Sequence, residues 1–320
     1  MRRYRPFFLA LAGFVLFSLA LRPKQGYLKA LVTVYSPPVC EVPADRRFGI
    51  EYYGMIYSGN TTNLIDRRVL CTGSWETHIQ QFLGRTAEML ERVKGEPADD
   101  LVFLDIGANT GLHSMFMSRY VGVIHAFDPY PPVVAQMRYN LERNNLQNVI
   151  LHPVGLGDAA ARLPFVEPKD SNQGTGSFLP EAGLPGRMQG LELEVVVGDD
   201  YFREHGIDRA DLVKIDVEGF EKPVLLGLRR TFAKTRPIIE FEITVKQGVE
   251  RLFRSREELE AALPEDYELF GFTGSDPKSG AYKLVDFPVD FGAFLGGQWD
   301  LVAAPAELAD ELPMVGEASW

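Results

Sequence analysis

The sequence is poor in positive charge and in cysteine. It contains 33 lysines and arginines against 44 aspartates and glutamates, so its formal net charge at pH 7 is −11. Because nucleic-acid binders normally present a basic face to the phosphates, this balance argues against a nucleic-acid partner. The two cysteines, Cys40 and Cys71, precede the motifs described below, and no Gly-x-Ser-x-Gly segment is present. Hydrolase and thiol mechanisms are therefore disfavoured.

Histidine is also scarce, and its spacing does not suggest a metal site. No pair of histidines has a convincing metal-ligand spacing. We therefore predict no metal centre and expect most histidines to be packing or surface residues. His113 is the one candidate for a site role, because it lies beside a glycine-containing loop. The five histidines are His78, His113, His125, His152 and His205.

Long hydrophobic runs are limited to residues 7–21, which are fifteen residues without a charge. Arginines flank this run on both sides. A spanning helix needs ~20 apolar residues, with a lower limit near ~17, and the core of a signal peptide can be shorter. We favour an uncleaved signal-anchor that contacts the membrane through residues 7–21. A cleaved signal peptide is the alternative, and a buried helix is the third.

Two further patterns bear on the compartment. Asn60-Thr61-Thr62 is an acceptor pattern for N-glycosylation. A disulfide between Cys40 and Cys71 would close a loop of about 30 residues and stabilise the fold by roughly 3–4 kcal/mol. Together with the apolar leader, these patterns predict a single-pass membrane protein whose catalytic domain lies in the secretory-pathway lumen or the extracytoplasmic space.

Changes in pattern along the chain predict four parts. Residues 1–24 form the signal-anchor or signal peptide. Residues 25–97 form a stalk and N-terminal extension that ends in a helix over 76–94, expected to pack on the main domain. The main domain covers 98–290, and 291–320 form a C-terminal tail.

Within the main domain, short apolar runs alternate with segments of helical character. Runs of this kind are typical of strands buried on both faces of a sheet. Their alternation with helices predicts an α/β fold with a doubly wound, mostly parallel sheet and helices on both faces. The predicted core strands cover residues 101–104, 123–127, 149–151, 211–216 and 236–243.

The other segments of this domain are less regular. Residues 159–190 are rich in glycine, proline and polar residues and predict loops or a hairpin, with an edge or hairpin strand over 191–197. Two more strands, over 267–270 and 282–285, are expected to close the domain. We expect the acceptor site to be shaped by 159–190 and by the N-terminal extension.

Acidic residues gather where the predicted strands end. In a doubly wound sheet the ligand binds beyond the carboxyl ends of the strands. Carboxylates at neighbouring strand ends are costly unless they are paired or solvated, so a functional cluster is the better interpretation, although such a residue can also cap a helix. The residues concerned are Asp105, Asp128, Asp216, Glu240 and Glu242.

The loop after the first strand indicates which cofactor binds. Residues 105–111 read Asp-Ile-Gly-Ala-Asn-Thr-Gly, and a dinucleotide site would need Gly-x-Gly-x-x-Gly here. Two of those three glycines are replaced, by Asn109 and Leu112, which disfavours a nicotinamide-dependent oxidoreductase. Asp128, at the end of the second strand, is placed to accept both ribose hydroxyls of an adenosine group.

Four motifs in order resemble those of the FkbM-type methyltransferases. They are residues 105–114 (Asp-Ile-Gly-Ala-Asn-Thr-Gly-Leu-His-Ser), 126–129 (Ala-Phe-Asp-Pro), 155–158 (Gly-Leu-Gly-Asp) and 214–221 (Lys-Ile-Asp-Val-Glu-Gly-Phe-Glu). The resemblance covers about residues 100–243, and Asp128 departs from it because the family more often has glutamate there. It implies a Rossmann-like, seven-stranded methyltransferase sheet, S-adenosylmethionine as methyl donor, and O-methylation of a hydroxyl on a glycan or small metabolite.

The resemblance also implies roles for the donor-binding residues. The loop glycines and the asparagine between them would hold the methionine end of the donor. Asp105 would contact that loop or the donor ammonium, Asp128 the ribose, and Asp158 the adenine amine. The loop residues meant are Gly107, Asn109 and Gly111.

A hydroxyl acceptor must also lose its proton. Asp216 or Glu218, at and just beyond the fourth strand, is the expected base. A divalent metal that polarises the hydroxyl is a rival mechanism. A structural role is the other alternative, with Glu218 and Glu221 capping the helix that opens at Pro223. For the whole chain, a donor-binding or scaffold protein without turnover is the main alternative to an enzyme.

Overall fold

The computed structural model describes residues 45–168, 172–178, 186–244, 249, 252–276, 280–287 and 298–316. The apolar run 7–21 and Cys40 lie outside these ranges, so the signal-anchor stays a prediction. Cys71 is disulfide-bonded. No helix in the ranges given combines the length and hydrophobicity that crossing a bilayer requires.

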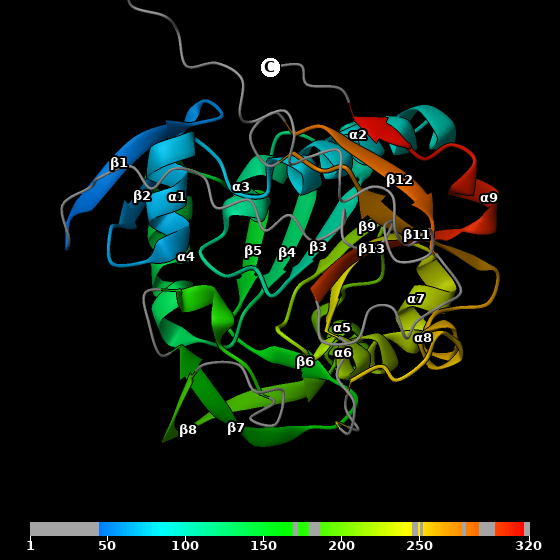
Figure 1. Ribbon diagram of the computed structural model, residues 1–320. Coiled ribbons are helices and arrows are strands. Elements are labelled where there is room, and N and C mark those ends of the chain that lie inside the picture. Colours follow the sequence, from blue (N-terminus) through cyan, green and yellow to red (C-terminus); the bar gives the residue numbers. More distant parts are fainter. Residues whose placement is uncertain are drawn as a thin grey trace, which may run out of the picture. The chain divides into compact units, whose positions relative to one another are not determined.

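Five parallel strands form one side of the large sheet (Figure 1). They pair in the order β10-β9-β3-β4-β5. The chain therefore runs outward from β3 to β5 and then returns to β9 on the other side of β3. This reversal places a crevice at the carboxyl ends of β3 and β9. The strands are β3 (Val102–Ile106), β4 (Val123–Phe127), β5 (Val149–His152), β9 (Leu212–Ile215) and β10 (Ile238–Thr244), and they confirm the predicted core strands.

The sheet is larger than the seven strands expected, and one of its strands comes from the predicted tail. β13 (Gln298–Pro305) lies between β10 and β11 (Tyr267–Thr273) and is antiparallel to both. β12 (Tyr282–Asp286) and β14 (Val315–Gly316) extend the sheet beyond β11, giving nine strands in the described residues. The assignment of 291–320 to a tail is therefore wrong, because these strands pair with partners far away in the sequence.

Helices cover both faces of the sheet, because successive side chains of a strand point to opposite faces. Leu104 packs with α5 (Gly198–His205), α6 (Glu221–Gly227), α7 (Arg229–Thr235) and α8 (Arg256–Ala262). Its neighbour Phe103 packs with α2 (Thr77–Lys94) and α3 (Leu112–Met117) on the other face. The short helix α9 (Ala306–Ala309) follows β13, and η1 (Ala98–Asp100) precedes β3. The fold is thus the Rossmann-like α/β class predicted.

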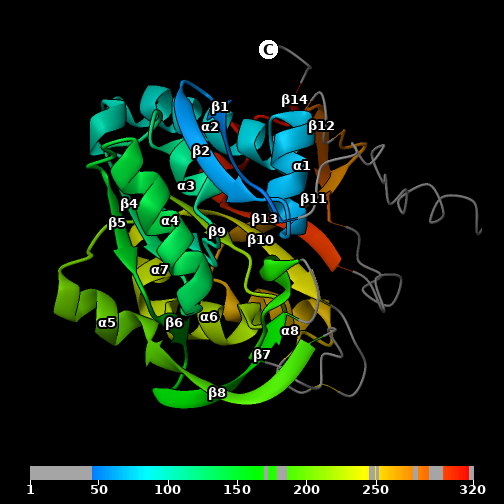
Figure 2. The same ribbon diagram turned by 90° about the vertical axis from the view of Figure 1, so that its left-hand side faces the viewer.

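The N-terminal extension is a folded part of the molecule from residue 45 onward. β1 (Arg47–Tyr52) and β2 (Met55–Asn60) form a hairpin that is followed by α1 (Leu64–Thr72). In both ribbon views the hairpin and α1 lie beside α4 (Pro131–Arg143) (Figures 1 and 2). The predicted helix over 76–94 is confirmed as α2, but the described part of the predicted stalk has elements that the sequence pattern did not indicate.

A buried polar network joins this extension to the domain. The Tyr57 hydroxyl lies 2.6 Å from Asp66 Oδ1 and 2.9 Å from Thr110 Oγ1. Gln136 Nε2 of α4 and the Asn60 N–H donate to Asp66 Oδ2 at 3.1 and 2.7 Å. Asp66 is fully buried. Because Thr110 belongs to the loop after β3, the network ties that loop to the N-terminal extension.

A second, smaller sheet lies beyond the carboxyl ends of the parallel strands. β6 (Gly155–Gly157), β8 (Gly186–Val197) and β7 (Ala161–Pro168) pair in that order. β7 and β8 form the hairpin expected for this region. The short helix η2 (Gln173–Thr175) lies between them in sequence.

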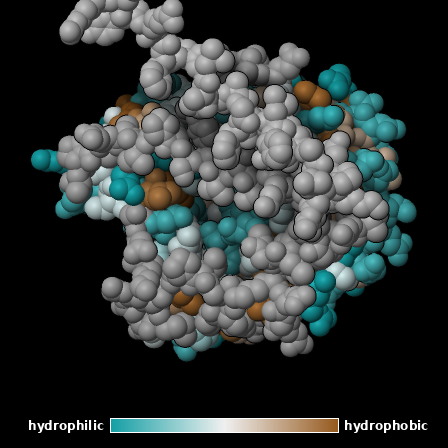
Figure 3. All heavy atoms as spheres, in the orientation of Figure 1, coloured by the Kyte–Doolittle hydropathy of each residue, from teal (hydrophilic) through white to brown (hydrophobic). Residues whose placement is uncertain are grey.

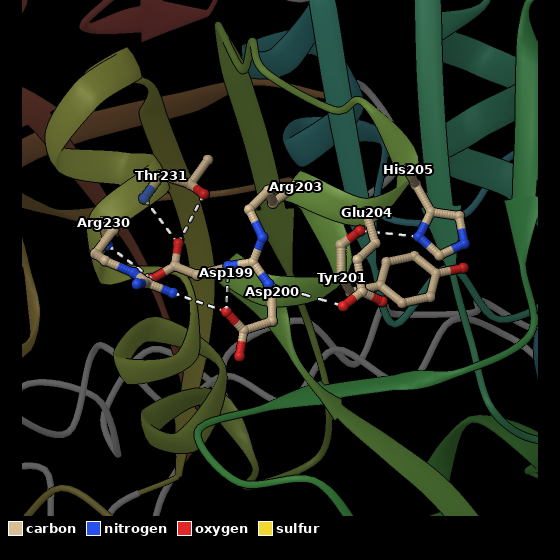
Figure 4. A network of polar contacts seen from close by, with 8 residues as sticks. All are labelled: Asp199, Asp200, Tyr201, Arg203, Glu204, His205, Arg230 and Thr231. Atoms are coloured by element: carbon tan, nitrogen blue, oxygen red, sulfur yellow. Dashed lines mark hydrogen bonds and ion pairs between the residues drawn. The ribbon is translucent and has the colours of Figure 1, made fainter.

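A surface polar network joins helices α5 and α7 (Figure 4). Asp199 of α5 accepts hydrogen bonds from the backbone N–H of Arg230 and Thr231, at 3.0 and 2.8 Å. These N–H groups belong to the first turn of α7, which has no acceptors within its own helix. Arg230 also pairs with Asp200. The network therefore caps α7 and joins it to α5.

Removal of the buried carboxylate in the N-terminal network should destabilise the fold. Asp66→Ala leaves the donors on Tyr57, Gln136 and Asn60 without their acceptor, so the free energy of unfolding should fall by roughly 2–4 kcal/mol. Urea unfolding measures this change. The exposed Asp208 provides the matched control, because Asp208→Ala should change stability by less than about 0.5 kcal/mol. Equal effects of the two variants would contradict the network.

Candidate functional site

A cavity of about 420 Å³ lies at the crevice between β3 and β9. Hydrophilic residues are visible at the centre of the face that Figure 3 shows. The loops after β3, β4 and β9 line the cavity, together with Trp75 and Glu76 from the extension and Gln298 from β13. Three distant parts of the sequence therefore share one cavity. Within the described residues, no group of histidine, cysteine, aspartate and glutamate side chains could hold a metal ion.

Gly107 brings two of these loops together. It has φ +87°, and a Cβ atom at this position would lie 1.8 Å from the backbone oxygen of Asp216. Only glycine permits this approach of the β3 loop to the β9 loop. The N–H groups of Gly107 and Ala108 both donate to the Phe127 carbonyl, at 2.9 and 3.0 Å, which also ties the loop to the end of β4.

Asp128 holds the same loop from the end of β4. Its Oδ2 accepts a hydrogen bond from the Asn109 N–H at 2.9 Å, and its Oδ1 accepts one from the Tyr130 N–H at 2.8 Å. Burial raises the pKa of Asp128 to about 7 even though these two bonds oppose the shift. Each oxygen retains a lone pair that can accept a hydrogen bond from a ligand in the cavity.

Asp105 and Gly111 support the loop without lining the cavity. Asp105 is 1% exposed and accepts a hydrogen bond from the Ser114 hydroxyl at 2.5 Å. Burial raises its pKa, which the charge of Lys214 opposes. Gly111, with φ +85°, begins α3 and packs against Met137. A direct contact of Asp105 or Gly111 with a ligand is therefore not supported.

An ion pair lies beneath the β9 side of the cavity. Lys214 Nζ donates to Asp216 Oδ2 at 2.9 Å, and Lys214 is only 3% exposed. Burial by itself would lower the pKa of Lys214, but the charges of Asp216, Glu76 and Glu240 raise it well above its usual value. The lysine is therefore a permanent cation in the wall of the cavity.

Glu218 faces the cavity in a strained conformation. Its φ is +51°, and its side chain accepts a hydrogen bond from Gln298 Nε2 at 3.2 Å. Gln298 also donates to Glu242 Oε1 at 2.8 Å, so one amide bridges the two carboxylates. Burial and the charges of Asp216 and Glu221 raise the pKa of Glu218 to about 8. The side chain of Glu218 therefore does not cap the following helix, which was the structural alternative considered for it.

Glu221 has a structural role, but not the helix cap considered for it, because α6 has no side-chain capping hydrogen bond. Its Oε1 accepts hydrogen bonds from the backbone N–H of Gly219 at 2.9 Å and of Val217 at 3.3 Å. Because Glu221 is buried and engaged with the loop that carries Glu218, it positions that loop.

Two residues on the α2 and α3 side complete the polar wall. Glu76 begins α2 with φ +47°, and burial raises its pKa to about 7. His113 is 7% exposed, and its Nε2 has no hydrogen-bond partner. This nitrogen lies 3.6 Å from Glu76 Oε2, beyond hydrogen-bond distance. Burial and the charge of Lys214 lower the pKa of His113 well below its usual value, so the imidazole is neutral.

Three of the eight described non-glycine residues with positive φ line this cavity. Asn109, Glu76 and Glu218 all have positive φ and all line it. Positive φ is unfavourable for a residue with a side chain, and for glutamate especially so. Such strain persists where the surrounding structure imposes it, commonly at functional sites.

The opposite end of the cavity is apolar. Tyr130 stacks on Phe165 with ring centroids 5.3 Å apart, and Phe165 contacts Phe178 edge-on at 5.2 Å. Phe178 in turn lies 5.2 Å from Phe220. Gly174 of η2 closely approaches the Asn109 side chain. The segment between β7 and β8 therefore contributes to the cavity wall, and a flat aromatic ligand group would fit this end.

The structure brings most, but not all, of the predicted site residues together. Gly107, Asn109, Asp128, Asp216 and Glu218 line the cavity. Asp158 does not: it is exposed and follows β6, on the side where the chain approaches α6. The adenine contact expected of Asp158 is therefore not supported, because Gly155 and Leu156 of β6 line the cavity and Asp158 beyond them does not.

Several residues of the wall were not predicted. Lys214 was part of a recognised motif but received no role. Glu76 and Gln298 lie in segments assigned to the extension and the tail, where no local pattern indicated a site. The short apolar run at 299–304 was the only signal that could have identified β13 and hence Gln298.

Introduction of a methyl group at Gly107 should disrupt the contact between the two loops. Gly107→Ala should lower the free energy of unfolding by at least ~3 kcal/mol, because the added carbon overlaps the Asp216 carbonyl. Gly54 has a similar φ of +82° but open space around it, so Gly54→Ala isolates the backbone cost of roughly 1 kcal/mol. Urea unfolding of both variants gives the comparison, and equal losses would contradict the close approach.

The raised pKa of Glu218 predicts a pH-dependent stability. A carboxyl whose pKa is about 8 in the folded protein binds its proton more tightly there than in the unfolded chain, so stability is lost as the pH rises toward 8. Glu218→Gln removes this loss. Between pH 5 and pH 8 the free energy of unfolding of the variant should therefore rise by roughly 1–2 kcal/mol relative to that of the wild type. The rise is this small because the group is partly exposed.

Urea unfolding at several pH values measures this gain. Glu204, which is exposed on α5, supplies the control. The free energy of unfolding of Glu204→Gln should differ from that of the wild type by the same amount at every pH. A constant difference for Glu218→Gln as well would show that its pKa is not raised.

Comparisons with known proteins place the chain among methyltransferases. Residues 105–265 match the family model of the methyltransferase FkbM domain. The 31-O-demethyl-FK506 methyltransferase FkbM of Streptomyces tacrolimicus is 31% identical over 162 residues, which cover 40% of this chain and 59% of that protein. The hexuronic acid methyltransferase AglP of Haloferax volcanii is 25% identical over 155 residues, covering 48% and 60%.

A third relative and one solved structure are also similar to this chain. The 2-O-methyltransferase NoeI of Sinorhizobium fredii is 27% identical over 150 residues, covering 43% of this chain and 61% of that protein. The chain thus spans about three fifths of the length of the relatives it matches. The crystal structure of methyltransferase FkbM from Methylobacillus flagellatus has 16% identity and a TM-score of 0.41, covering 64% of this chain and 44% of that one.

Proposed function

The chain belongs to the FkbM methyltransferase family, and from this premise we propose that it transfers a methyl group from S-adenosylmethionine to a hydroxyl of a glycan or small metabolite. The observation that carries the proposal is the cavity in which the Asp128 carboxylate and the Gly107–Gly111 loop meet the carboxylates after β9. The relative named for 2-O-methylation supports a hydroxyl as the acceptor.

The described residues fit this donor. The aromatic end of the cavity, near Tyr130 and Phe165, would hold the adenine. Asp128 would accept hydrogen bonds from the ribose hydroxyls with its remaining lone pairs. The loop at Gly107 and Asn109 would hold the methionine end. Asn109 Oδ1 is buried and has no hydrogen-bond partner, so it can accept a bond from the donor ammonium.

When bound, S-adenosylmethionine supplies an electrophilic methyl group on a positively charged sulfur. The acidic wall formed by Asp216, Glu218 and Glu242 favours such a positive charge. The neighbouring residues align the acceptor and exclude water, which is the main contribution that this reaction needs from a protein.

Of the two carboxylates expected to act as the base, Glu218 is better suited. Asp216 is already engaged, because its Oδ2 accepts a hydrogen bond from the Lys214 ammonium group at 2.9 Å. The pKa of Glu218 near 8 makes its ionised form a stronger base, and it is well matched to operation near neutral pH. We propose that Glu218 takes the proton from the acceptor hydroxyl as the new carbon–oxygen bond forms.

Loss of the Asp128 side chain should remove donor binding. Asp128→Ala deletes the ribose contact and both loop bonds, so the affinity for S-adenosylmethionine should fall by roughly 100-fold, two strong hydrogen bonds being involved. Isothermal calorimetry measures the change. Asp158→Ala should leave the affinity unchanged, because Asp158 is exposed outside the cavity. Unaltered affinity in Asp128→Ala would disprove the ribose site.

Turnover is tested by untargeted detection of product. Membranes that contain the protein, and membranes that lack it, are supplied with methyl-labelled S-adenosylmethionine. The proposal is supported by a labelled methyl ether that forms only when the protein is present. This product should disappear in Glu218→Gln while calorimetry shows retained donor binding. Donor binding without any labelled product would favour the non-catalytic scaffold, and binding of NAD instead would favour the oxidoreductase.

We also propose that residues 7–21 attach the protein to a membrane, with the catalytic domain in a lumenal or extracytoplasmic space. The uncharged run with flanking arginines, the glycosylation pattern at Asn60 and the disulfide at Cys71 support this arrangement. Alkaline extraction should leave the chain in the membrane pellet. Protection from added protease, together with sensitivity to glycosidase, would support the orientation, and full digestion in intact vesicles would contradict it.

A further inference from the structure

The part of the cavity beyond the donor loop is lined by carboxyl groups with almost no cation beside them. The carboxylates that line the cavity are Glu76, Asp128, Asp216, Glu218 and Glu242, and Lys214 is the one lysine or arginine among the described lining residues. Its ammonium group is already hydrogen-bonded to Asp216. No cation in the described wall is therefore available to neutralise an anionic acceptor.

The carboxylates of this wall are held as hydrogen-bond acceptors. Gln298 Nε2 donates to Glu218 Oε2 and Glu242 Oε1, at 3.2 and 2.8 Å, which keeps the two groups side by side. Each ionised carboxylate has about four lone-pair sites. The other oxygens and lone pairs of both groups can accept hydrogen bonds from neighbouring hydroxyls of one ligand.

An independent feature points to a ligand that donates hydrogen bonds. His113 is 7% exposed and lines the cavity, yet its Nε2 has no hydrogen-bond partner. A buried polar atom without a partner is costly. Since Glu76 Oε2 lies 3.6 Å from this nitrogen, a hydroxyl or ammonium group placed between them could bond to both.

Resting on the proposed function, we propose that the acceptor is a polyhydroxylated compound that is neutral or carries an amine, and that it is bound through its hydroxyls by Glu218, Glu242, Glu76 and His113. Acceptors with a carboxylate or phosphate on the reacting ring are excluded. The pKa values of Glu76, Glu218 and Glu242 are raised, so these groups repel an anionic acceptor once they ionise at alkaline pH. The repulsion is then strong, because the effective dielectric constant of a partly buried site is low.

The test compares four probes with the same pyranose ring. They are methyl glucoside, methyl glucosaminide, methyl glucuronide and glucose 6-phosphate. Binding to the full chain saturated with S-adenosylhomocysteine is measured by ligand-observed NMR at constant ionic strength. The neutral and amino sugars should bind at least ~10-fold more tightly than the two anions. Equal or tighter binding of either anion overturns the proposal, and so does binding of none of the four, since the hydroxyls themselves are proposed to be recognised.

Two variants make the test specific to the acidic wall. The probes and variants are compared at pH 9, above the pKa values of Glu76 and Glu218. Glu218→Gln keeps the shape of the side chain and removes one charge at this pH, so the preference for neutral over anionic probes should shrink by several-fold. Glu204→Gln, on the exposed surface of α5, should leave the preference unchanged. An unchanged preference in Glu218→Gln overturns the electrostatic explanation.

Calorimetry with S-adenosylhomocysteine on the same preparations separates this inference from the proposed function. Absence of binding would reject the donor site, and with it the methyltransferase. Normal binding with a reversed order of the sugar probes would reject the acceptor class alone.

Discussion

The buried ammonium group of Lys214 makes the acidic site possible. Burial of a carboxylate is costly unless a charge or hydrogen-bond donor compensates it. Lys214 pairs with Asp216, and its charge opposes the increase in pKa that burial causes at Asp105, Glu76 and Glu240. One cation on β9 therefore stabilises carboxylates that come from β3, α2 and β10. The compensation is incomplete, because the pKa values of all three carboxyl groups remain raised.

The cavity has two chemically different ends because different elements supply them. The aromatic residues near Tyr130 and Phe165 come from the β4 side and the smaller sheet. The carboxylates of Asp216 and Glu218 come from the loop after β9, and that of Glu242 comes from β10. Gly107 lies between the two ends, and its close approach to the Asp216 carbonyl sets their spacing. A donor and an acceptor can therefore meet above β3 and β9, where the direction of strand addition reverses.

The extension and the last part of the chain are components of this site. Tyr57 and Asp66 hold Thr110 of the donor loop through a buried network. Glu76 enters the cavity from the start of α2, and Gln298 bridges two of its carboxylates. The family match covers residues 105–265, so these contributions come from outside it. Residues of this kind are suited to distinguish one acceptor from another on a shared donor-binding fold.

Much of the framework followed from the sequence by itself. Short apolar runs determined the five parallel strands, the turn after the first of them determined the glycine loop, and the end of the second determined the position of Asp128. These features depend on neighbouring residues, whose patterning and turn chemistry are local. The pairing of β13 between β10 and β11, the entry of Glu76 and the isolation of Asp158 were decided only by the tertiary structure. Each depends on contacts between segments far apart in the chain, and the direction in which a strand end points depends on the sheet to which that strand belongs.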